Sequence, residues 1–198
     1  MNTVPNHNMA TKADTNQLPL VAHPTTPLPA VRSLVAHAGL DESGELEAGF
    51  VVSGDLDQIV WPAARPIIRA DELWQTTCFE LFVAMPDSER YLEFNFSPSR
   101  QWAAYGFERY RAGMQPLEAV EIKTFDIARD DDRFMLRVRL NAPALRAVPS
   151  AAVPVALSAV IEASDNGISY WALAHPSDRP DFHDKKGFTG TLVNRKDT

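Results

Sequence analysis

The chain has 198 residues, 45% of them hydrophobic, which is enough for one domain with a substantial core. Its 26 acidic and 19 basic residues give a formal net charge of −7. This acidic balance argues against a general nucleic-acid binder, because such proteins contact phosphates mainly through Lys and Arg. The single cysteine, Cys78, excludes an internal disulfide and is typical of a reducing compartment. We therefore expect a soluble, cytoplasmic domain with no nucleic-acid partner.

The first part of the chain differs in composition from the rest. Residues 1–30 are rich in Asn, Thr and Pro and show no hydrophobic periodicity. Such a segment buries too little apolar surface to offset its ordering entropy, so we predict a disordered tail over 1–30 and one domain over 31–194. The N-terminus lacks the basic and apolar regions of a secretory signal. No stretch reaches the roughly 18 apolar residues of a membrane span, so we expect no membrane association.

From residue 31 onward the sequence indicates short strands separated by turns. Asn166-Gly167 is a strong hairpin turn signal, and residues 71–75 and 143–146 are interpreted as single helical turns or short helices. The predicted strands cover residues 31–38, 46–52, 76–84, 91–96, 101–110, 119–125, 133–140, 153–163 and 168–175. Many short strands without a long helical pattern predict an all-β fold, an antiparallel β-sandwich of the immunoglobulin-like or jelly-roll-like kind.

Polar side chains line one face of the two most aromatic strands, 76–84 and 91–96. Because strand residues alternate between faces, each strand has one mostly apolar face and one mixed face. The mixed faces carry Cys78, Glu80 and Phe82 on the first strand, and Tyr91, Glu93 and Asn95 on the second. One hairpin register places Glu80 beside Glu93, and a slip by two residues pairs Glu80 with Asn95 instead. In either register two carboxylates and an amide share a surface, which fits a solvated outer face or a ligand-binding one.

The same surface has the chemistry of a sugar site. Carboxylates accept hydrogen bonds from vicinal hydroxyls, and Asn both accepts and donates. Trp74 lies shortly before Glu80, and Trp171 lies in the last long strand. An indole face packs against the C–H face of a sugar ring, although a single Trp is equally typical of a core.

Four segments resemble the bacterial DOMON-like domains, which are related to carbohydrate-binding module family 9. The segments are residues 73–83 (LWQTTCFELFV), 91–98 (YLEFNFSP), 102–105 (WAAY) and 169–176 (SYWALAHP). The resemblance covers most of residues 31–190 and implies a β-sandwich that binds sugar or haem without catalysis. It also implies that Trp74 and Trp171 clamp a terminal sugar while Glu80 and Asn95 bind it. The departure from this pattern is Glu93, near which the sugar binders carry a basic residue.

Other site chemistries give weaker matches. Some DOMON relatives hold haem b through an axial Met with His or Lys, but Met85, Met114 and Met135 match no such ligand pair by position. Residues 175–183 form a polar loop without a zinc spacing, and its His175 and His183 are candidate ligand contacts. Residues 130–132 lack the spacing of a calcium loop. We therefore expect neither a metal nor a resident cofactor, with haem b as the alternative.

The two acids also permit a catalytic interpretation. Glu80 and Glu93 on adjacent strands come near the separation of about 5 Å that retaining glycosidases use. No nucleophile elbow, phosphate loop or zinc helix is present in the sequence. The leading hypothesis is thus a binding domain for a saccharide, not an enzyme, whose ligand contacts are Trp74, Glu80, Glu93, Asn95, Trp171, His175 and His183. A haem-binding electron-transfer module and a glycosidase using the two acids are the alternatives.

Overall fold

The computed structural model describes residues 17–147 and 153–192, and these form an all-β structure with no α-helix among them. The strands are β1 (Leu18–Ala22), β2 (Val31–Leu40), β3 (Leu46–Gly54), β4 (Cys78–Ala84), β5 (Tyr91–Phe96), β6 (Trp102–Phe107), β7 (Gln115–Pro116), β8 (Glu121–Arg129), β9 (Arg133–Asn141), β10 (Val153–Glu162), β11 (Ile168–Ala172) and β12 (Gly190–Leu192). Four 3-10 turns join them: η1 (Leu56–Gln58), η2 (Leu73–Gln75), η3 (Pro143–Ala147) and η4 (Lys185–Gly187).

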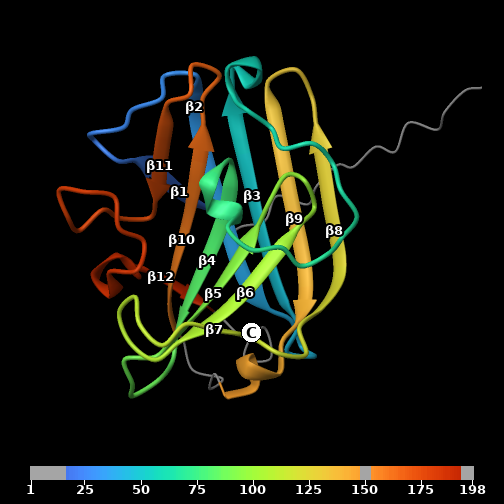
Figure 1. Ribbon diagram of the computed structural model, residues 1–198, viewed down its shortest axis with the longest axis vertical. Helices are drawn as coiled ribbons and strands as arrows, with labels where there is room; N and C mark the ends of the chain where they lie inside the picture. Colours follow the sequence, from blue (N-terminus) through green and yellow to red (C-terminus); the bar gives the residue numbers. More distant parts are fainter. Residues whose placement is uncertain (1–16, 148–152, 193–198) are drawn as a thin grey trace, which may run out of the picture.

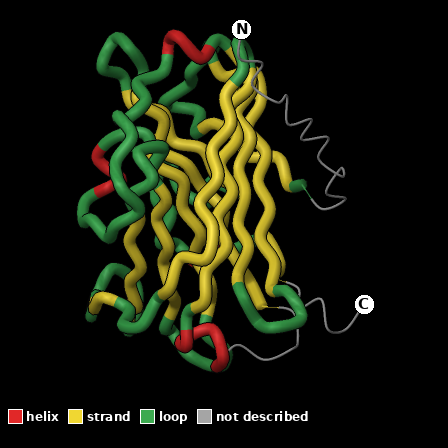
Figure 2. Tube along the Cα trace, turned by 90° about the vertical axis from the view of Figure 1, so that its right-hand side faces the viewer, coloured by secondary structure: helices red, strands yellow, loops and turns green. Residues whose placement is uncertain are grey.

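The strands form one curled, antiparallel sheet (Figure 1). Its order is β7-β6-β5-β4-β10-β11-β1-β2-β3-β9-β8, and β12 pairs with β10 outside this path. β1 joins the two halves, because Leu18–Leu20 pair with β2 whereas Val21 and Ala22 pair with β11. Figure 2 shows the strands running side by side with loops at both ends. The all-β, antiparallel class expected from the sequence is confirmed.

The two halves of the curled sheet pack against each other through aromatic side chains. The ring of Phe79 on β4 lies 5.0 Å from that of Phe50 on β3 and 5.8 Å from that of Phe134 on β9. These three residues belong to one buried apolar cluster that includes side chains from both halves. The strand alternation predicted for β4 and β5 is therefore correct on its apolar side, which faces this core.

The sheet begins earlier than the sequence predicts. β1 lies inside the segment assigned to a disordered tail, and Leu20 is buried in the main core. The segment around β1 is rich in Asn, Thr and Pro, so its composition indicated disorder, whereas pairing with β2 and β11 stabilises the strand. Residues 1–16, the rest of the predicted tail, lie outside the described residues. The short strands β7 and β12 were also not predicted.

The opposite face of β4, β5, β6 and β10 carries a second buried cluster. Its floor is formed by strand residues, and Leu73 from η2 and Phe188 after η4 pack onto it. In Figure 1 these strands lie in front, with the loop after β6 and the red C-terminal loops beside them. Loops therefore cover this face of β4 and β5, which the sequence predicts to be an outer sheet surface.

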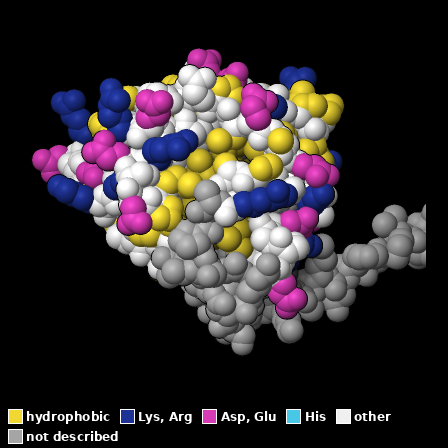
Figure 3. All heavy atoms as spheres, turned by 90° about the horizontal axis from the view of Figure 1, so that it is seen from below, with side chains coloured by type: hydrophobic (Ala, Val, Ile, Leu, Met, Phe, Trp, Pro, Cys, Tyr) yellow, Lys and Arg dark blue, Asp and Glu magenta, His cyan; other side chains and the backbone are white. Residues whose placement is uncertain are grey.

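The lower end of the molecule has a different surface. Seen from below, hydrophobic side chains gather in its middle, between Lys or Arg and Asp or Glu side chains (Figure 3). Charges of both signs are thus mixed on this end, although the chain as a whole carries a net charge of −7.

Candidate functional site

The two carboxylates and the amide emerge from the same side of the sheet. β4 and β5 pair so that Glu80 lies opposite Asn95 and Phe82 lies opposite Glu93. This is the shifted register of the two that the sequence left open. Glu80 and Glu93 are therefore diagonal neighbours rather than direct cross-strand partners, and Asn95 lies next to both.

All three polar residues are buried. Glu80 is 3% exposed, Glu93 6% and Asn95 1%. The loop that follows β11 contributes Phe182 and Phe188 to the cluster above the sheet, and His183 of the same loop contacts Phe82 edge-on at 5.2 Å. The sequence predicted an open face, and the structure shows a covered one.

Hydrogen bonds fix the acids only in part. Asn95 Nδ2 donates to Glu93 Oε1 at 2.7 Å, and Ser158 Oγ donates to Glu80 Oε2 at 3.3 Å from β10. The amide oxygen of Asn95, in contrast, has no hydrogen-bond partner among the described residues. A buried acceptor without a partner costs free energy and is uncommon in native structures, so it marks this cluster as more than packing.

A short relay connects Glu93 to the loops above it. The backbone N–H of Arg111 donates to the Tyr91 oxygen at 3.2 Å, and the Tyr91 hydroxyl lies 2.7 Å from His183 Nδ1. The two atoms share one hydrogen bond, whose direction follows the tautomer of His183. The other ring nitrogen, His183 Nε2, lies 4.0 Å from Glu93 Oε2.

The two covering loops are tied together at Asp181. Its carboxylate accepts hydrogen bonds from Tyr110 Oη at 2.6 Å, from Arg111 Nη2 at 2.9 Å and from the His183 backbone N–H at 3.1 Å. Lys185 Nζ adds a hydrogen bond to the Ser88 carbonyl at 2.9 Å, on the β4–β5 turn. We call the group of three side chains that meet at Asp181, namely Tyr110, Arg111 and Asp181 itself, the loop latch.

Burial shifts the protonation of the acids and of the histidine. Desolvation, and then repulsion from Glu93, raise the pKa of Glu80 to about 8, and desolvation also raises the pKa of Glu93. Desolvation and the positive charge of Arg111 lower the pKa of His183 to about 4. At neutral pH the cluster therefore holds a protonated Glu80 and a neutral imidazole, and the two acids behave as a coupled pair.

The two tryptophans are not on one surface. Trp74 in η2 is 52% exposed, and its neighbour Leu73 packs on the edge of the acid-bearing face. Trp171 is 7% exposed and belongs to the main core. Its register explains this position: Trp171 pairs with Ala159, which faces the core, whereas Ser158 shares the face of Glu80. The two indoles therefore do not face each other, and the expected clamp is not formed.

The two candidate histidines separate in the same way. His183 lies above Glu93, as described. His175 Nε2 instead contacts the Val21 carbonyl at 2.9 Å, and its ring lies edge-on to that of His23 at 4.8 Å. Of the predicted site residues, the structure thus gathers Glu80, Glu93, Asn95 and His183, places Trp74 at the edge, and leaves Trp171 and His175 elsewhere.

Several residues of the cluster were not predicted as site residues. Ser158 could have been found from alternation along β10, because it shares parity with Ala156 on the same face. Tyr91 was placed on the correct face but given no role. No sequence pattern indicates Arg111 or Asp181, because both are loop residues whose meeting depends on the tertiary fold.

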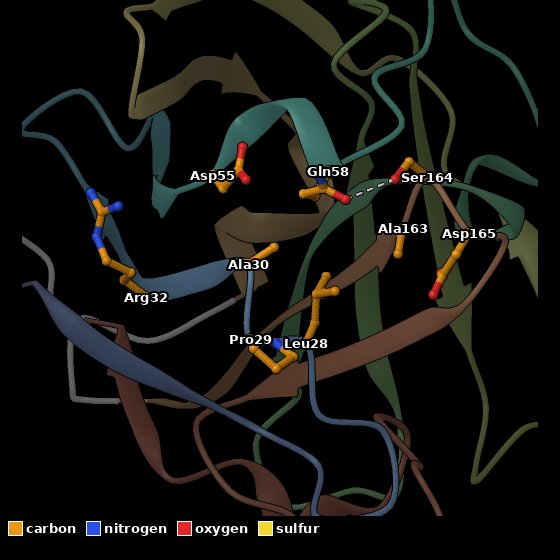
Figure 4. A pocket seen from close by; sticks show the side chains of 9 residues that line it. All are labelled: Leu28, Pro29, Ala30, Arg32, Asp55, Gln58, Ala163, Ser164 and Asp165. Carbon is orange, nitrogen blue, oxygen red and sulfur yellow. Dashed lines mark hydrogen bonds between the residues drawn. The ribbon is translucent and has the colours of Figure 1, made fainter.

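A pocket of about 520 Å³ lies apart from the acid cluster (Figure 4). It is lined by Leu28, Pro29, Ala30, Arg32, Asp55, Gln58, Ala163, Ser164 and Asp165. Ser164 Oγ donates to Gln58 Oε1 at 3.2 Å on its wall. None of the predicted site residues lines this pocket.

The described ranges show neither a metal cluster nor a membrane-spanning helix. They contain no group of three or more His, Cys, Asp or Glu residues arranged to hold a metal ion. No helix in this part of the chain has the length and apolar character needed to cross a bilayer.

Comparison with known proteins gives a likeness of fold. No protein-family model matches the chain, and no curated protein matches it. The structure is similar to that of a candidate carbohydrate-binding protein from Bacteroides uniformis ATCC 8492, with a TM-score of 0.61 and 16% sequence identity over 90% of this chain and 86% of that one. At this identity the likeness concerns the fold.

Proposed function

We propose that the protein binds a carbohydrate, without catalysis, at the face of β4, β5, β6 and β10 that carries Glu80, Glu93 and Asn95. The observation that carries the proposal is the buried amide oxygen of Asn95, which has no partner within the described residues and adjoins two carboxyl groups. A ligand hydroxyl would satisfy this acceptor. Carboxyl and amide groups together match the alternating donors and acceptors of a sugar.

The aromatic side chains at this face support a sugar ligand. Trp74 presents a half-exposed indole at the edge of the face, where it can pack against a sugar ring. Tyr105 on β6 lies on the same face beside Glu93, and its hydroxyl donates to Asp71 Oδ1 at 2.6 Å. In this proposal one exposed indole, not a pair, provides the stacking surface.

The fold gives independent support at a coarser level. The structural neighbour is itself a candidate carbohydrate-binding protein. The curled sheet with two packed halves is compatible with the β-sandwich of the DOMON-like and family 9 carbohydrate-binding domains, and we propose that type for this chain. Ligand contacts then come from Trp74, Glu80, Glu93, Asn95 and His183.

Calorimetric titration with a panel of mono- and disaccharides tests the proposal. We expect at least one saccharide to bind the wild-type protein, and Trp74→Ala and Asn95→Leu each to weaken binding about tenfold or more, because each loses a contact worth over 1 kcal/mol. Met114→Ala is the matched control, since Met114 is equally exposed but lies outside the cluster. Absence of binding across the panel, or binding unchanged in both site variants, would contradict the proposal.

Two cheap measurements separate the alternatives. A Soret band in the absorption spectrum of the purified protein would indicate haem instead of sugar. Release of reducing sugar from an oligosaccharide that binds, abolished in Glu93→Gln, would show that the acid pair is catalytic. The proposal requires neither signal.

A further inference from the structure

The acid cluster is rich in hydrogen-bond acceptors. Glu80 and Glu93 contribute carboxyl oxygens, and Asn95 contributes an unpartnered amide oxygen. Asn95 Nδ2 donates to Glu93 and the Tyr105 hydroxyl donates to Asp71, while the Tyr91 hydroxyl and His183 Nδ1 share one hydrogen bond. The unpartnered polar atom of the cluster is thus an acceptor, which a hydrogen-bond donor of a ligand would satisfy.

The cluster also lacks a cation of its own. Arg111 is the nearest guanidinium, but it forms its salt bridge with Asp181, at 2.9 Å, and not with either glutamate. Lys185 donates to backbone carbonyls of the β4–β5 turn. His183 shares a hydrogen bond with the Tyr91 hydroxyl, and its pKa of about 4 leaves it neutral. Among the described residues, no Lys or Arg pairs with Glu80 or Glu93, although buried carboxylates are normally paired.

We infer that the group recognised at this cluster is an ammonium, so that the saccharide of the proposed function is an amino sugar with a free amine. This inference rests on the proposed function and narrows its ligand class. The ammonium would donate to Glu80, to Glu93 and to the Asn95 amide oxygen, which between them supply an acceptor for each of its three hydrogens. The sugar ring would extend toward the exposed indole of Trp74.

Proton balance makes the inference testable. In the free protein the coupled pair of acids keeps a proton on Glu80, because desolvation and Glu93 raise its pKa. An ammonium between the two carboxyls offsets their repulsion, so Glu80 ionises and its proton passes to the buffer. The other titratable or charged groups around the pair are Cys78, Tyr91, Tyr105, Arg111, Asp181 and His183, and burial keeps the Cys78 thiol protonated by raising its pKa. Of these, none changes its ionisation at neutral pH in this scheme.

The test compares glucosamine with N-acetylglucosamine and glucose by calorimetry at about pH 6.5, where a sugar amine with the pKa of an α-amino group is charged. We expect glucosamine to bind about tenfold or more tightly than both neutral sugars, which is the scale of hydrogen bonds to charged groups. Titration in buffers of different ionisation enthalpy should show release approaching one proton per bound glucosamine, and none for glucose.

Variants assign the effect to the acid pair. Glu80→Gln keeps the size of the side chain and removes the titrating proton, so it should abolish proton release and reduce the preference for glucosamine. Glu42→Gln, an exposed acid in the β2–β3 turn, is the matched control and should change neither. Circular dichroism verifies that each variant is folded before the titration is interpreted.

The outcomes separate this inference from the proposed function. Equal affinity for glucosamine and the neutral sugars, or glucosamine binding without proton release, overturns the ammonium inference and leaves sugar binding intact. Absence of binding by any sugar overturns both. A glucosamine preference that survives in Glu80→Gln and in Glu93→Gln overturns the assignment to this cluster.

Discussion

Glu80 is a carboxyl group whose protonation departs strongly from that of an exposed glutamate. It lies fully inside the second cluster, with one hydroxyl donor from Ser158 and a second acid two residues from its cross-strand partner. Sequence reasoning found the residue and its face, because alternation along a strand depends only on backbone geometry. It could not find the burial, because the covering loops carry no periodic pattern.

The raised pKa of Glu80 predicts a pH-dependent stability. A folded-state pKa of about 8, above the ordinary value of 4.5 for a glutamate, means that the unfolded chain holds fewer protons between these two pH values. The free energy of unfolding should therefore fall as pH rises through this window, by a few kcal/mol, since one pKa unit corresponds to about 1.4 kcal/mol.

Chemical denaturation of the wild type and of Glu80→Gln, between about pH 6.5 and about pH 9, measures this dependence. The variant should lose most of the decline and should be the more stable protein at the alkaline end. The lower limit avoids His183, whose folded pKa of about 4 adds stability above its unfolded value of 6.5 that is lost as pH falls. Parallel curves for the two proteins would show that Glu80 does not titrate in this range.

At the scale of elements, strand positions were predictable and strand partners were not. β5 has the predicted bounds, and β4 and β9 differ from theirs by at most two residues. The register of β4 with β5 stayed open because both pairings satisfied the same alternation. The face of Trp171 was likewise undetermined, since Tyr170 and Trp171 are both aromatic and only pairing with β10 decides which of them enters the core.

β1 shows how a short strand can depend on its position in the sheet. Leu20 is buried, whereas its neighbour Val21 is half-exposed, and β1 is the element through which the halves join. Leu20→Ala should lower the free energy of unfolding by about 2 to 5 kcal/mol, the usual cost of such a core truncation. Val21→Ala, in the same strand, should cost much less. Equal, small effects in denaturant titration would mean that β1 does not contribute to the core.

The loop latch predicts a local change rather than a global one. Arg111→Ala removes one of the three donors to Asp181, so residues 181–188 should exchange amide hydrogens faster while β10 keeps its protection. Arg32→Ala is a suitable control, because it breaks an exposed ion pair with Asp132 at another place. Uniformly faster exchange across the sheet would instead show that Arg111 stabilises the whole fold.

At the scale of the molecule, the two halves of the sheet share one core and should unfold together. Phe79 contacts rings from β3 and β9, and Trp61 stacks on Phe134 at a centroid distance of 4.2 Å between the same layers. Unfolding followed by tryptophan fluorescence and by far-ultraviolet circular dichroism should therefore give one coincident transition. Phe79→Ala should move both signals to lower denaturant by the same amount, at a cost of about 3 to 5 kcal/mol.

Separate transitions would mean that each half retains its own structure. The architecture argues against this outcome, because β1 pairs with strands of both halves and the main cluster draws side chains from both layers. The second cluster, with Glu80 and Glu93, lies on the other side of β4 and β5 and shares their backbone. Loss of the main core should consequently dismantle the acid cluster as well, so that bound sugar raises the midpoint of the single transition instead of splitting it.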